Sequence, residues 1–243
     1  MTETIETIET TEAIADRLAA IRARIDAAVA RRGPGPDVRL IGVGKRQPLD
    51  KLLAAHAAGL RDFGENYAQE LRDKQREWPP ELQARWHYIG ALQANKLKYL
   101  VGKTALIHTV DRPELIAAID ERAARLGVVQ DFLIEVALAG EQQKAGVSPE
   151  RMPELLEVCA RTRATRCRGL MIIPPAADDP EQTRPWFREL RQLAERLRER
   201  GPERPIVELR ELSMGMSADF EVAIEEGATL VRVGTSIFGE REG

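Results

Sequence analysis

The chain has 243 residues, of which 43% are hydrophobic and 31% are charged, and its formal net charge is −3. This composition is ordinary for a globular protein and unlike that of a disordered chain. The charges nearly balance, and no basic tail or run of interleaved basic and aromatic residues is present, so nucleic acid is not an expected partner.

The cysteines and the N-terminus indicate the kind of protein. Cys159 and Cys167 make neither a disulfide framework nor a four-ligand zinc site, and we expect both to be buried thiols. No apolar run approaches the roughly 18 residues of a membrane span. The segment Met1–Thr11 is acidic, rich in Thr and Glu and unlike a signal peptide. We therefore expect a cytoplasmic protein with a flexible N-terminus over residues 1–11.

The first periodic segment runs from Glu12 to Arg32 and predicts an amphipathic helix. Gly33 follows as a stop signal, and the short β-branched run Val38–Gly44 predicts the first strand. Apolar residues recur along the helix in steps of three and four, at Ile14, Leu18, Ile21, Ile25 and Val29.

From there to the end of the chain, short apolar runs alternate with helical patterns. Helices are expected to begin near Asp111 and Ser148, and a third includes Trp186 and Leu197, with its start left open between Asp179 and Pro185. The strand candidates are Val38–Gly44, Arg61–Gly64, Trp86–Ile89, Ala105–Thr109, Asp131–Ala137, Arg166–Ile173, Ile206–Leu212 and Thr229–Val233.

Eight strands that alternate with helices predict a parallel sheet. A single (β/α)8 TIM barrel with an extra N-terminal helix accounts for this count best, and it would occupy residues 12–243 as one domain. A doubly wound sheet is the alternative. It is weakened because neither a glycine-rich dinucleotide motif nor a P-loop follows the first strand.

In a barrel, ligand-binding residues gather at the C-terminal ends of the strands, and Lys45 ends the first strand. If the strand alternates, Lys45 shares an inward face with Ile41 and Val43. The chain has seven lysines against 29 arginines (36 − 7), so this lysine is less easily explained as generic surface charge. Spacing leaves two interpretations open: a lysine that reaches out to solvent, or a buried amine of lowered pKa that attacks an aldehyde.

Two further strand ends are candidates for a phosphate site. Ser213–Asp219 follows the seventh strand, and Ser217 is the expected N-cap of a helix whose N-terminus would attract an anion. Arg232–Ser236 closes the eighth strand, where Gly234 lets the backbone approach a ligand and Thr235 offers a hydroxyl. Barrels commonly bind phosphate after strands seven and eight, so the two segments together favour a phosphate site over two plain turns.

Arg232 shares a strand face with Leu230 and Gly234, so its side chain should point into the barrel. A guanidinium group cannot be neutralised and needs an acceptor. Apart from a ligand, the candidate partners are the carboxylates of Glu208 and Glu211.

Other polar residues carry weaker signals. His87 lies on a short strand and is expected to be a core histidine with hydrogen-bond partners. Asn66 follows the second strand and either caps the next helix or reaches the cavity. The sequence contains no metal-ligand spacing and no convincing Ser/His/Asp set.

In six motifs, which follow in order between Val38 and Arg241, the chain resembles the pyridoxal phosphate homeostasis protein family. The last motif is long and specific. The first departs from the family pattern at Gly44 and Arg46, where Ser or Thr is more usual, and the third has Ala91 and Ala94 in place of more polar residues. The motifs are GVGKRQP (Gly42–Pro48), DFGENYAQEL (Asp62–Leu71), WHYIGALQANK (Trp86–Lys96), QQKAG (Gln142–Gly146), GLMIIPP (Gly169–Pro175) and LSMGMSADFEVAIEEGATLVRVGTSIFGER (Leu212–Arg241).

The resemblance implies a barrel similar to the N-terminal domain of alanine racemase, with pyridoxal 5′-phosphate (PLP) as the cofactor. It implies that Lys45 carries PLP as a Schiff base, that Arg232 meets the pyridine nitrogen, and that Asn66 lies near the ring. The phosphate is expected at Ser217, Gly234 and Thr235, with Met216 beside it.

Members of this family are regarded as carriers or regulators of PLP supply, not as established enzymes. The resemblance therefore implies a role in PLP (vitamin B6) homeostasis. We expect the cofactor and PLP-dependent apo-enzymes as partners, and a monomer.

Two alternatives belong to other classes of protein. A fold-type III racemase or decarboxylase needs a second acid/base group, usually supplied by a C-terminal domain and a partner subunit. The chain ends ten residues after Val233, so we expect that domain to be absent. An aldolase that uses a lysine without a cofactor would need no phosphate site, which the segments SMGMS and RVGTS oppose.

Overall fold

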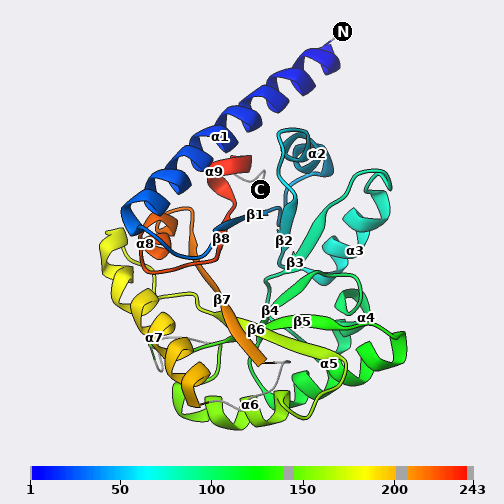
Figure 1. The fold of residues 1–243 in the computed structure, drawn as a ribbon. Coiled ribbons are helices and arrows are strands. Elements are labelled where there is room, and N and C mark those ends of the chain that lie inside the picture. Colours follow the sequence, from blue (N-terminus) through cyan, green and yellow to red (C-terminus); the bar gives the residue numbers. More distant parts are fainter. Residues whose placement is uncertain (1, 140–144, 201–206, 240–243) are drawn as a thin grey trace.

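Eight parallel strands form a closed barrel in the computed structural model, which describes residues 2–139, 145–200 and 207–239 (Figure 1). Each strand pairs with the next in sequence order, and β8 pairs with β1. The predicted (β/α)8 barrel and its eight strands are confirmed. The strands are β1 (Arg39–Val43), β2 (Asp62–Glu65), β3 (Arg85–Tyr88), β4 (Leu106–Val110), β5 (Gln130–Glu135), β6 (Thr165–Met171), β7 (Val207–Met216) and β8 (Leu230–Val233).

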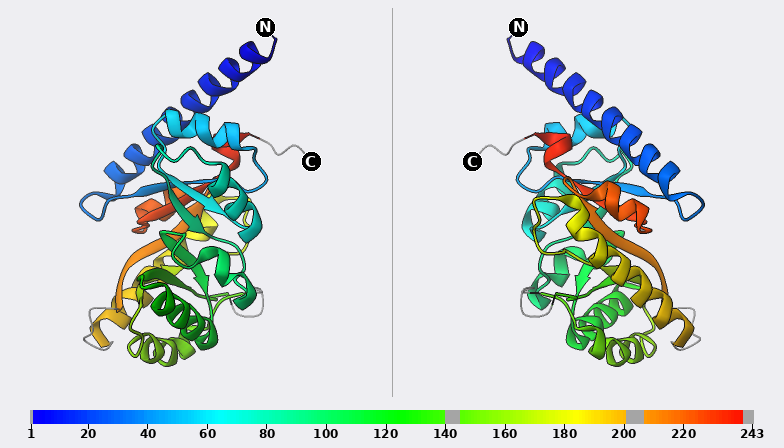
Figure 2. Two further views of the ribbon diagram at one scale, coloured as in Figure 1. Left: turned by 90° about the vertical axis from the view of Figure 1, so that its right-hand side faces the viewer. Right: turned by 90° about the vertical axis from the view of Figure 1, so that its left-hand side faces the viewer.

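Helices surround the strands on the outside of the barrel (Figures 1 and 2). The helices are α1 (Thr2–Arg32), α2 (Leu49–Ala57), α3 (Ala68–Glu77), α4 (Leu97–Leu100), α5 (Pro113–Leu126), α6 (Met152–Cys159), α7 (Arg184–Arg200), α8 (Phe220–Glu225) and α9 (Thr235–Phe238). The start of the third predicted helix was left open between Asp179 and Pro185, and two helical elements begin in this interval. A 3-10 helix begins at Pro180, capped by the Asp179 carboxylate, and α7 follows it from Arg184.

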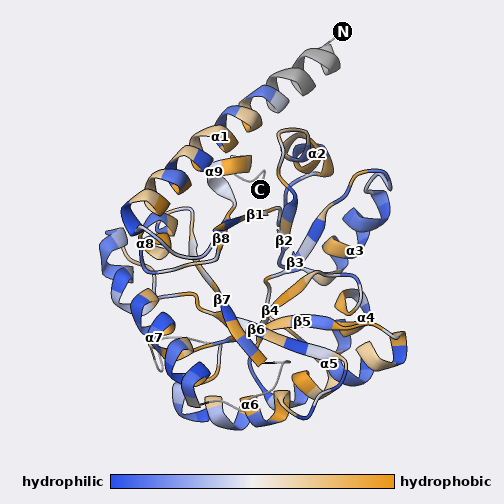
Figure 3. Cartoon of the chain, viewed as in Figure 1, coloured by the Kyte–Doolittle hydropathy of each residue, from blue (hydrophilic) through white to orange (hydrophobic). Residues whose placement is uncertain are grey.

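Side chains alternate between the inside and the outside of the barrel wall. Outward residues such as Phe63 and Phe132 are fully buried in a large core between strands and helices. Hydrophilic residues dominate the outer helix α7, whereas β4 is largely hydrophobic (Figure 3). The apolar part of the interior is a separate small cluster of Ile41, Leu106, Leu133, Met171 and Leu230.

Helix α1 completes the outer wall of the barrel. The helix that follows β8 is only the four-residue α9, and α1 packs against α8, α9 and α2 at that position. Its buried face includes Leu18 and Ile21, as the periodicity predicts. The predicted start at Glu12 is wrong, because α1 begins at Thr2. The preceding stretch contains Ile5 and Ile8 in a three-residue step and three Glu residues, which are good helix formers. Its flexibility stays a prediction.

Both cysteines are free and buried, as predicted. A hydrogen bond with Cys159, together with burial, raises the pKa of Cys167 well above its usual range, so this thiol is unreactive near neutral pH. Within the described part of the chain, no helix is both long enough and apolar enough to cross a membrane.

The packing of α1 predicts that it contributes to global stability. Leu18 is 0% exposed and Leu126, on α5, is 50% exposed, so the same substitution can be compared at both sites. We expect Leu18→Ala to lower the free energy of unfolding by about 2–5 kcal/mol because it leaves a cavity, and Leu126→Ala to change it by about 0.5 kcal/mol or less. Urea denaturation followed by circular dichroism measures both. Equal effects at the two sites would mean that α1 is not part of the core.

Candidate functional site

A cavity of about 300 Å³ opens at the C-terminal ends of the strands. This volume is at the lower end of the roughly 300–1,000 Å³ usual for small-molecule sites. The predicted site residues lie at or just after the ends of four strands, β1, β2, β7 and β8, and the cavity brings them together. Their role in binding stays a prediction. All of the predicted site residues line the cavity: Lys45, Asn66, Met216, Ser217, Arg232, Gly234 and Thr235.

Lys45 reaches the cavity because β1 alternates as the sequence predicts. Ile41 belongs to the interior cluster, and Val43 and Lys45 line the cavity above it. Lys45 is half-buried, so its side chain belongs to the cavity wall and not to the open surface.

A buried ammonium group supports the backbone before Lys45. The Nζ atom of Lys74, on α3, donates to the carbonyl oxygen of Gly44 and to the carboxylates of Glu65 and Glu70, each at 2.7 Å. These three bonds use all the hydrogens of the amine. Burial raises the pKa of Glu65 to about 7, although the charge of Lys74 opposes the shift. The sequence reveals only an i,i+4 pair of Glu70 and Lys74, which is typical of a solvated helix face.

The backbone after Lys45 is held by the same group of residues. The amide N–H of Arg46 donates to Glu70 at 2.7 Å, and Arg46 has a positive φ of 56°. This conformation is uncommon for a non-glycine residue and persists only where the surroundings impose it. Both neighbours of Lys45 are therefore fixed, which limits where its amine can lie.

The expected N-cap role of Ser217 is wrong. Helix α8 begins at Phe220 with Asp219 at the N-cap position, and the Asp219 carboxylate accepts from the amide N–H of Met216 at 2.7 Å. The Ser217 hydroxyl instead accepts from the amide N–H of Gly234 at 3.4 Å. The two predicted phosphate segments are therefore in direct contact. The first of them also lies partly inside β7, which extends to Met216.

Glycine is required where these segments approach their neighbours. A Cβ atom on Gly234 would lie 3.3 Å from the Cβ atom and the carbonyl oxygen of Val43. Gly215 has a φ of 89°, and a Cβ atom there would lie 2.6 Å from that of Ala223 on α8. The glycines thus let β8 and β7 meet the cavity with exposed backbone.

Arg232 points into the barrel as predicted and is 4% exposed. The expected carboxylate partners are wrong. Its Nη1 donates to the hydroxyl of Ser213 at 2.6 Å, and its Nη2 donates to the carbonyl oxygen of Ile172 at 3.0 Å. Glu208 instead pairs with an arginine on β6, and Glu211 accepts from the threonine before β8.

The charge of Arg232 is balanced only at a distance. Neither of its two hydrogen-bond acceptors carries a charge. Burial lowers the pKa of Arg232 to about 10, and the charges of Asp219 and Glu135 oppose the shift. The group therefore stays protonated near neutral pH, which makes it a fixed cation at the cavity wall.

Two uncertain sequence assignments are now resolved. Asn66 lines the cavity. It does not cap α3, because Tyr67 occupies the N-cap position of that helix. The amide oxygen of Asn66 is buried and has no hydrogen-bond partner in the described part of the protein, so it can accept from a ligand or water. His87 is a core histidine as expected, bonded to Asp62 and to His108.

Glu135 ends β5 near Arg232 and is almost completely buried. Burial and the nearby charge of Asp111 raise its pKa to about 7, while the charge of Arg232 lowers it. An ionised carboxylate in this environment is unfavourable unless a cation compensates it.

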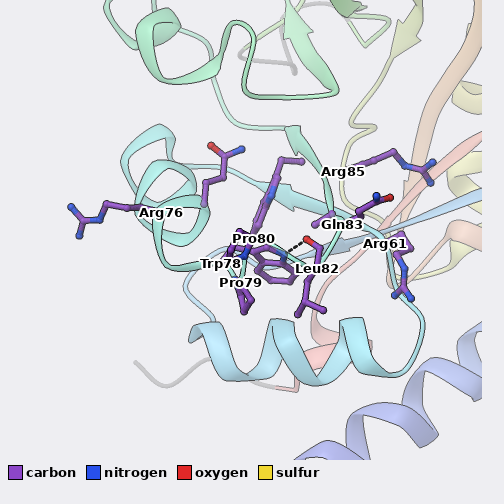
Figure 4. Close-up of a pocket in the computed structure, with 11 residues that line it drawn as sticks. Arg61, Arg76, Trp78, Pro79, Pro80, Leu82, Gln83 and Arg85 are labelled. Atoms are coloured by element: carbon purple, nitrogen blue, oxygen red, sulfur yellow. Dashed lines mark hydrogen bonds between the residues drawn. The ribbon is translucent and has the colours of Figure 1, made fainter.

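A larger cavity of about 820 Å³ lies outside the barrel, beside the segment that connects α3 to β3 (Figure 4). Three of the polar side chains that line it are engaged in hydrogen bonds. The indole N–H of Trp78 donates to the carbonyl oxygen of Leu82, and Arg85 is paired with Asp62. Arg61 donates to the backbone at the end of α2. This cavity lies away from the carboxyl ends of the strands and offers less to a ligand than the smaller one.

Comparison with known proteins identifies relatives across most of the chain. The family described as alanine racemase, N-terminal domain, matches residues 17–242. A pyridoxal phosphate homeostasis protein of Aquifex aeolicus is 46% identical over 228 residues, which cover 93% of this chain and 98% of the relative. One from Escherichia coli K12 is 38% identical over 234 residues, covering 94% and 97%. Of the motifs, Gln142–Lys144 and Glu240–Arg241 lie outside the described residues.

Two solved structures are similar in fold. PipY of Synechococcus elongatus PCC7942, solved with PLP bound, is 36% identical with a TM-score of 0.82, covering 93% of this chain and 100% of PipY. The alanine racemase of Corynebacterium glutamicum is 17% identical with a TM-score of 0.69, and the match covers 95% of this chain and 62% of the racemase. At that identity the second likeness shows the fold alone.

The raised pKa of Glu135 predicts a pH dependence of stability. Its pKa in the folded protein is about 7 against an ordinary 4.5, so the folded state holds the proton more tightly, and stability falls as the pH rises through this window. We expect the thermal midpoint of Glu135→Gln, relative to that of the wild type, to increase as the pH rises from about 5 to about 8. The exposed Glu81→Gln variant is the matched control. A difference in thermal midpoint between Glu135→Gln and the wild type that does not change with pH would contradict the prediction.

Proposed function

The chain belongs to the alanine racemase N-terminal domain family and, within it, to the pyridoxal phosphate homeostasis proteins, and we propose that it binds PLP at the mouth of its barrel and acts in PLP homeostasis. The observation that carries the proposal is the small cavity, where an amine, a fixed cation and a close approach of two backbone segments face one space. The relative solved with PLP bound supports the choice of cofactor.

The residues of the cavity fit the chemistry of PLP. The cofactor has an aldehyde, a ring nitrogen, a ring hydroxyl and a phosphate. The chain offers the amine of Lys45, the cation of Arg232 and the partnerless amide oxygen of Asn66. The contact between Ser217 and Gly234 supplies a hydroxyl and an exposed backbone for the phosphate.

Lys45 is the residue that we propose to hold the cofactor covalently. When bound, PLP supplies a carbonyl group that reacts reversibly with primary amines and a ring that withdraws electrons. The fixed backbone on both sides of Lys45 keeps its amine at the cavity. A reversible attachment suits a protein that takes up cofactor and releases it again.

Arg232 is proposed to donate to the ring nitrogen. Because its guanidinium group stays protonated, it donates a hydrogen bond and leaves the ring nitrogen without a proton. Such a ring is a poorer electron sink than a protonated one, although racemases of this fold tolerate the arrangement.

The phosphate is proposed to lie against Ser217, Gly234 and Thr235. Hydroxyl and backbone N–H groups are the usual donors to phosphate oxygens. Met216 is 37% exposed at the rim and would lie beside the phosphate.

The proposal favours a carrier over a racemase or decarboxylase. The described residues that line the cavity include no carboxyl, imidazole, phenol or thiol group that could act as a second acid/base. The match spans 98% of the Aquifex aeolicus homeostasis protein. An aldolase without cofactor is disfavoured by the same contact between the two proposed phosphate segments.

The biological context is part of the proposal. We infer that residues 12–243 form the PLP-binding domain, that the protein acts as a monomer in the cytoplasm, and that PLP-dependent apo-enzymes receive the cofactor. The name shared by the relatives supports the link to PLP homeostasis.

The proposed attachment predicts one modified lysine. Borohydride reduction of the PLP-loaded protein, followed by peptide mapping, should place the label on Lys45, because this lysine lines the cavity. Lys45→Ala should abolish the label, and Lys96→Ala should retain it. Recovery of the label mainly on Lys96 or Lys144 would refute the assignment.

The proposed phosphate site predicts that affinity depends on the phosphate group. Hydrogen bonds to a charged group contribute about 1.5–3 kcal/mol each, so pyridoxal should bind at least about tenfold more weakly than PLP. Gly234→Val should release PLP because its side chain enters space beside Val43. Gly35→Val, in the loop after α1 where the nearest atoms belong to the flexible side chain of Arg32, is the matched control.

Cofactor titration measures these affinities, and circular dichroism checks that each variant is folded. Equal affinity for pyridoxal and PLP would remove the phosphate site from the proposal. So would unchanged PLP binding by a folded Gly234→Val protein.

A further inference from the structure

A chain of polar side chains crosses the interior of the barrel from Arg232. Its Nη1 donates to Ser213 Oγ at 2.6 Å, and Ser213 Oγ lies 2.9 Å from His108 Nδ1. His108 Nε2 lies 3.0 Å from His87 Nδ1, and His87 Nε2 lies 3.0 Å from Asp62 Oδ1. The five residues come from β8, β7, β4, β3 and β2. Three of the four links join neighbouring strands, and only the contact between Ser213 on β7 and His108 on β4 crosses the interior between strands that do not pair.

The chain is buried along its whole length. Ser213 and His108 are 0% exposed, and the other members are nearly as inaccessible. The remaining interior is the apolar cluster around Ile41 and Leu133. Polar groups in such surroundings must find partners among themselves, because water is not at hand and an unpaired group is costly.

The far end of the chain is an ionised carboxylate. Asp62 accepts two bonds from Arg85, at 2.8 Å and 2.5 Å. Burial would raise the pKa of Asp62, but the hydrogen bonds from His87 and Arg85 outweigh it and hold the pKa below its ordinary value. An ionised carboxylate only accepts hydrogen bonds.

Because the carboxylate of Asp62 can only accept, it decides which atoms of the other members carry hydrogens. His87 must donate through Nε2 to Asp62, so its Nδ1 accepts from His108 Nε2. His108 Nδ1 then accepts from the hydroxyl of Ser213, which in turn accepts from Arg232. Both imidazoles are neutral in this assignment, in agreement with burial, which lowers the pKa of each. All the donors point away from Arg232 and toward Asp62.

We propose that Ser213, His108 and His87 are positioning residues that hold the guanidinium group of Arg232 in one orientation and couple the far end of the barrel to the cofactor ring. The inference rests on the proposed function, because it takes Arg232 as the group that meets the ring. The acceptor atoms of the chain face the cation and its donor hydrogens face the anion, so the aligned dipoles stabilise both charges.

The orientation follows from the two hydrogen bonds that Arg232 makes inside the barrel. The guanidinium group has five N–H donors in one plane. The bonds to Ser213 and to the carbonyl oxygen of Ile172 fix that plane from two sides. The remaining donors can then serve the cavity that Arg232 lines. Without Ser213 the group could rotate about its last side-chain bonds.

Other charged groups lie near the chain. Burial lowers the pKa of His87, its Asp62 partner raises it, and the charges of Arg39 and Arg85 lower it further. At the upper end, Glu135 and Asp219 face Arg232.

Nuclear magnetic resonance of the imidazole nitrogens tests the chain without cofactor. The protein has three histidines. The third, His56, bonds the carbonyl oxygen of Gln83 outside the barrel and is the internal control. His→Gln variants assign the signals. We expect His87 and His108 to remain neutral Nε2–H tautomers from about pH 6 to pH 8. Protonation of either one, or the Nδ1–H tautomer, would overturn the proposed chain.

The PLP-loaded protein tests the coupling through its absorption spectrum, which depends on the hydrogen bond at the ring nitrogen. Ser213→Ala should shift the absorption maximum and weaken PLP binding by about tenfold, the effect of one hydrogen bond to a charged group. His87→Gln, two links from Arg232, should shift the spectrum in the same direction by less. Thr165→Val removes a buried hydroxyl that has no hydrogen-bond partner in the described structure and should change neither property.

A wild-type spectrum and affinity in Ser213→Ala would overturn the proposal, as would an unchanged spectrum in a folded His87→Gln protein. If His87→Gln does not fold, Asp62→Asn keeps the shape and removes the charge, and the same shift is expected. Failure of the wild type to bind PLP would refute the proposed function, while the resonance experiment would still decide on the chain.

Discussion

The guanidinium group of Arg232 is a permanent charge inside a closed barrel, and most of the polar interior follows from it. Such a charge is tolerated only where hydrogen bonds replace its hydration. Ser213 and the carbonyl oxygen of Ile172 supply them, and the buried hydroxyl of Ser213 then needs an acceptor of its own, which is His108. Each buried polar group in turn needs a hydrogen-bond partner on another strand. The series ends at the ionised carboxylate of Asp62, which is paired with Arg85 near the surface. One buried cation thus explains why polar residues occupy an interior that barrels usually fill with branched apolar side chains.

The backbone after β1, the strand that pairs with β8, rests on a second buried charge, the ammonium group of Lys74. Its three bonds join α3, β2 and the turn after β1. The two charged groups have different consequences. Arg232 lines the cavity and makes two hydrogen bonds to uncharged groups, whereas all three hydrogens of the Lys74 amine are used, one of them in holding the backbone before Lys45. Lys45 itself is half-buried and lines the cavity.

The fold does not decide the function of this barrel. Its likeness to an alanine racemase lies in the arrangement of strands and helices, at 17% identity. What distinguishes the cavity is the chemistry of its lining, in which the described residues combine an amine, a cation and amide or hydroxyl groups, with no second acid/base among them. Such a lining is the basis of the proposal that the cavity binds a phosphorylated aldehyde and does not turn over a substrate.

Local patterns were enough to predict the eight strands, the inward faces of Lys45 and Arg232, and the two glycine-containing segments at the strand ends. Alternation along a strand and the position of glycine are properties of a few neighbouring residues, so the sequence by itself determined them. The partners of those residues were decided only by the tertiary structure. Ser213 and His108 are 105 residues apart and meet because closure brings β7 and β4 face to face across the interior. No local spacing encodes that meeting, and for the same reason the sequence did not distinguish the hydroxyl of Ser213 from the carboxylates of Glu208 and Glu211 as the group that binds Arg232.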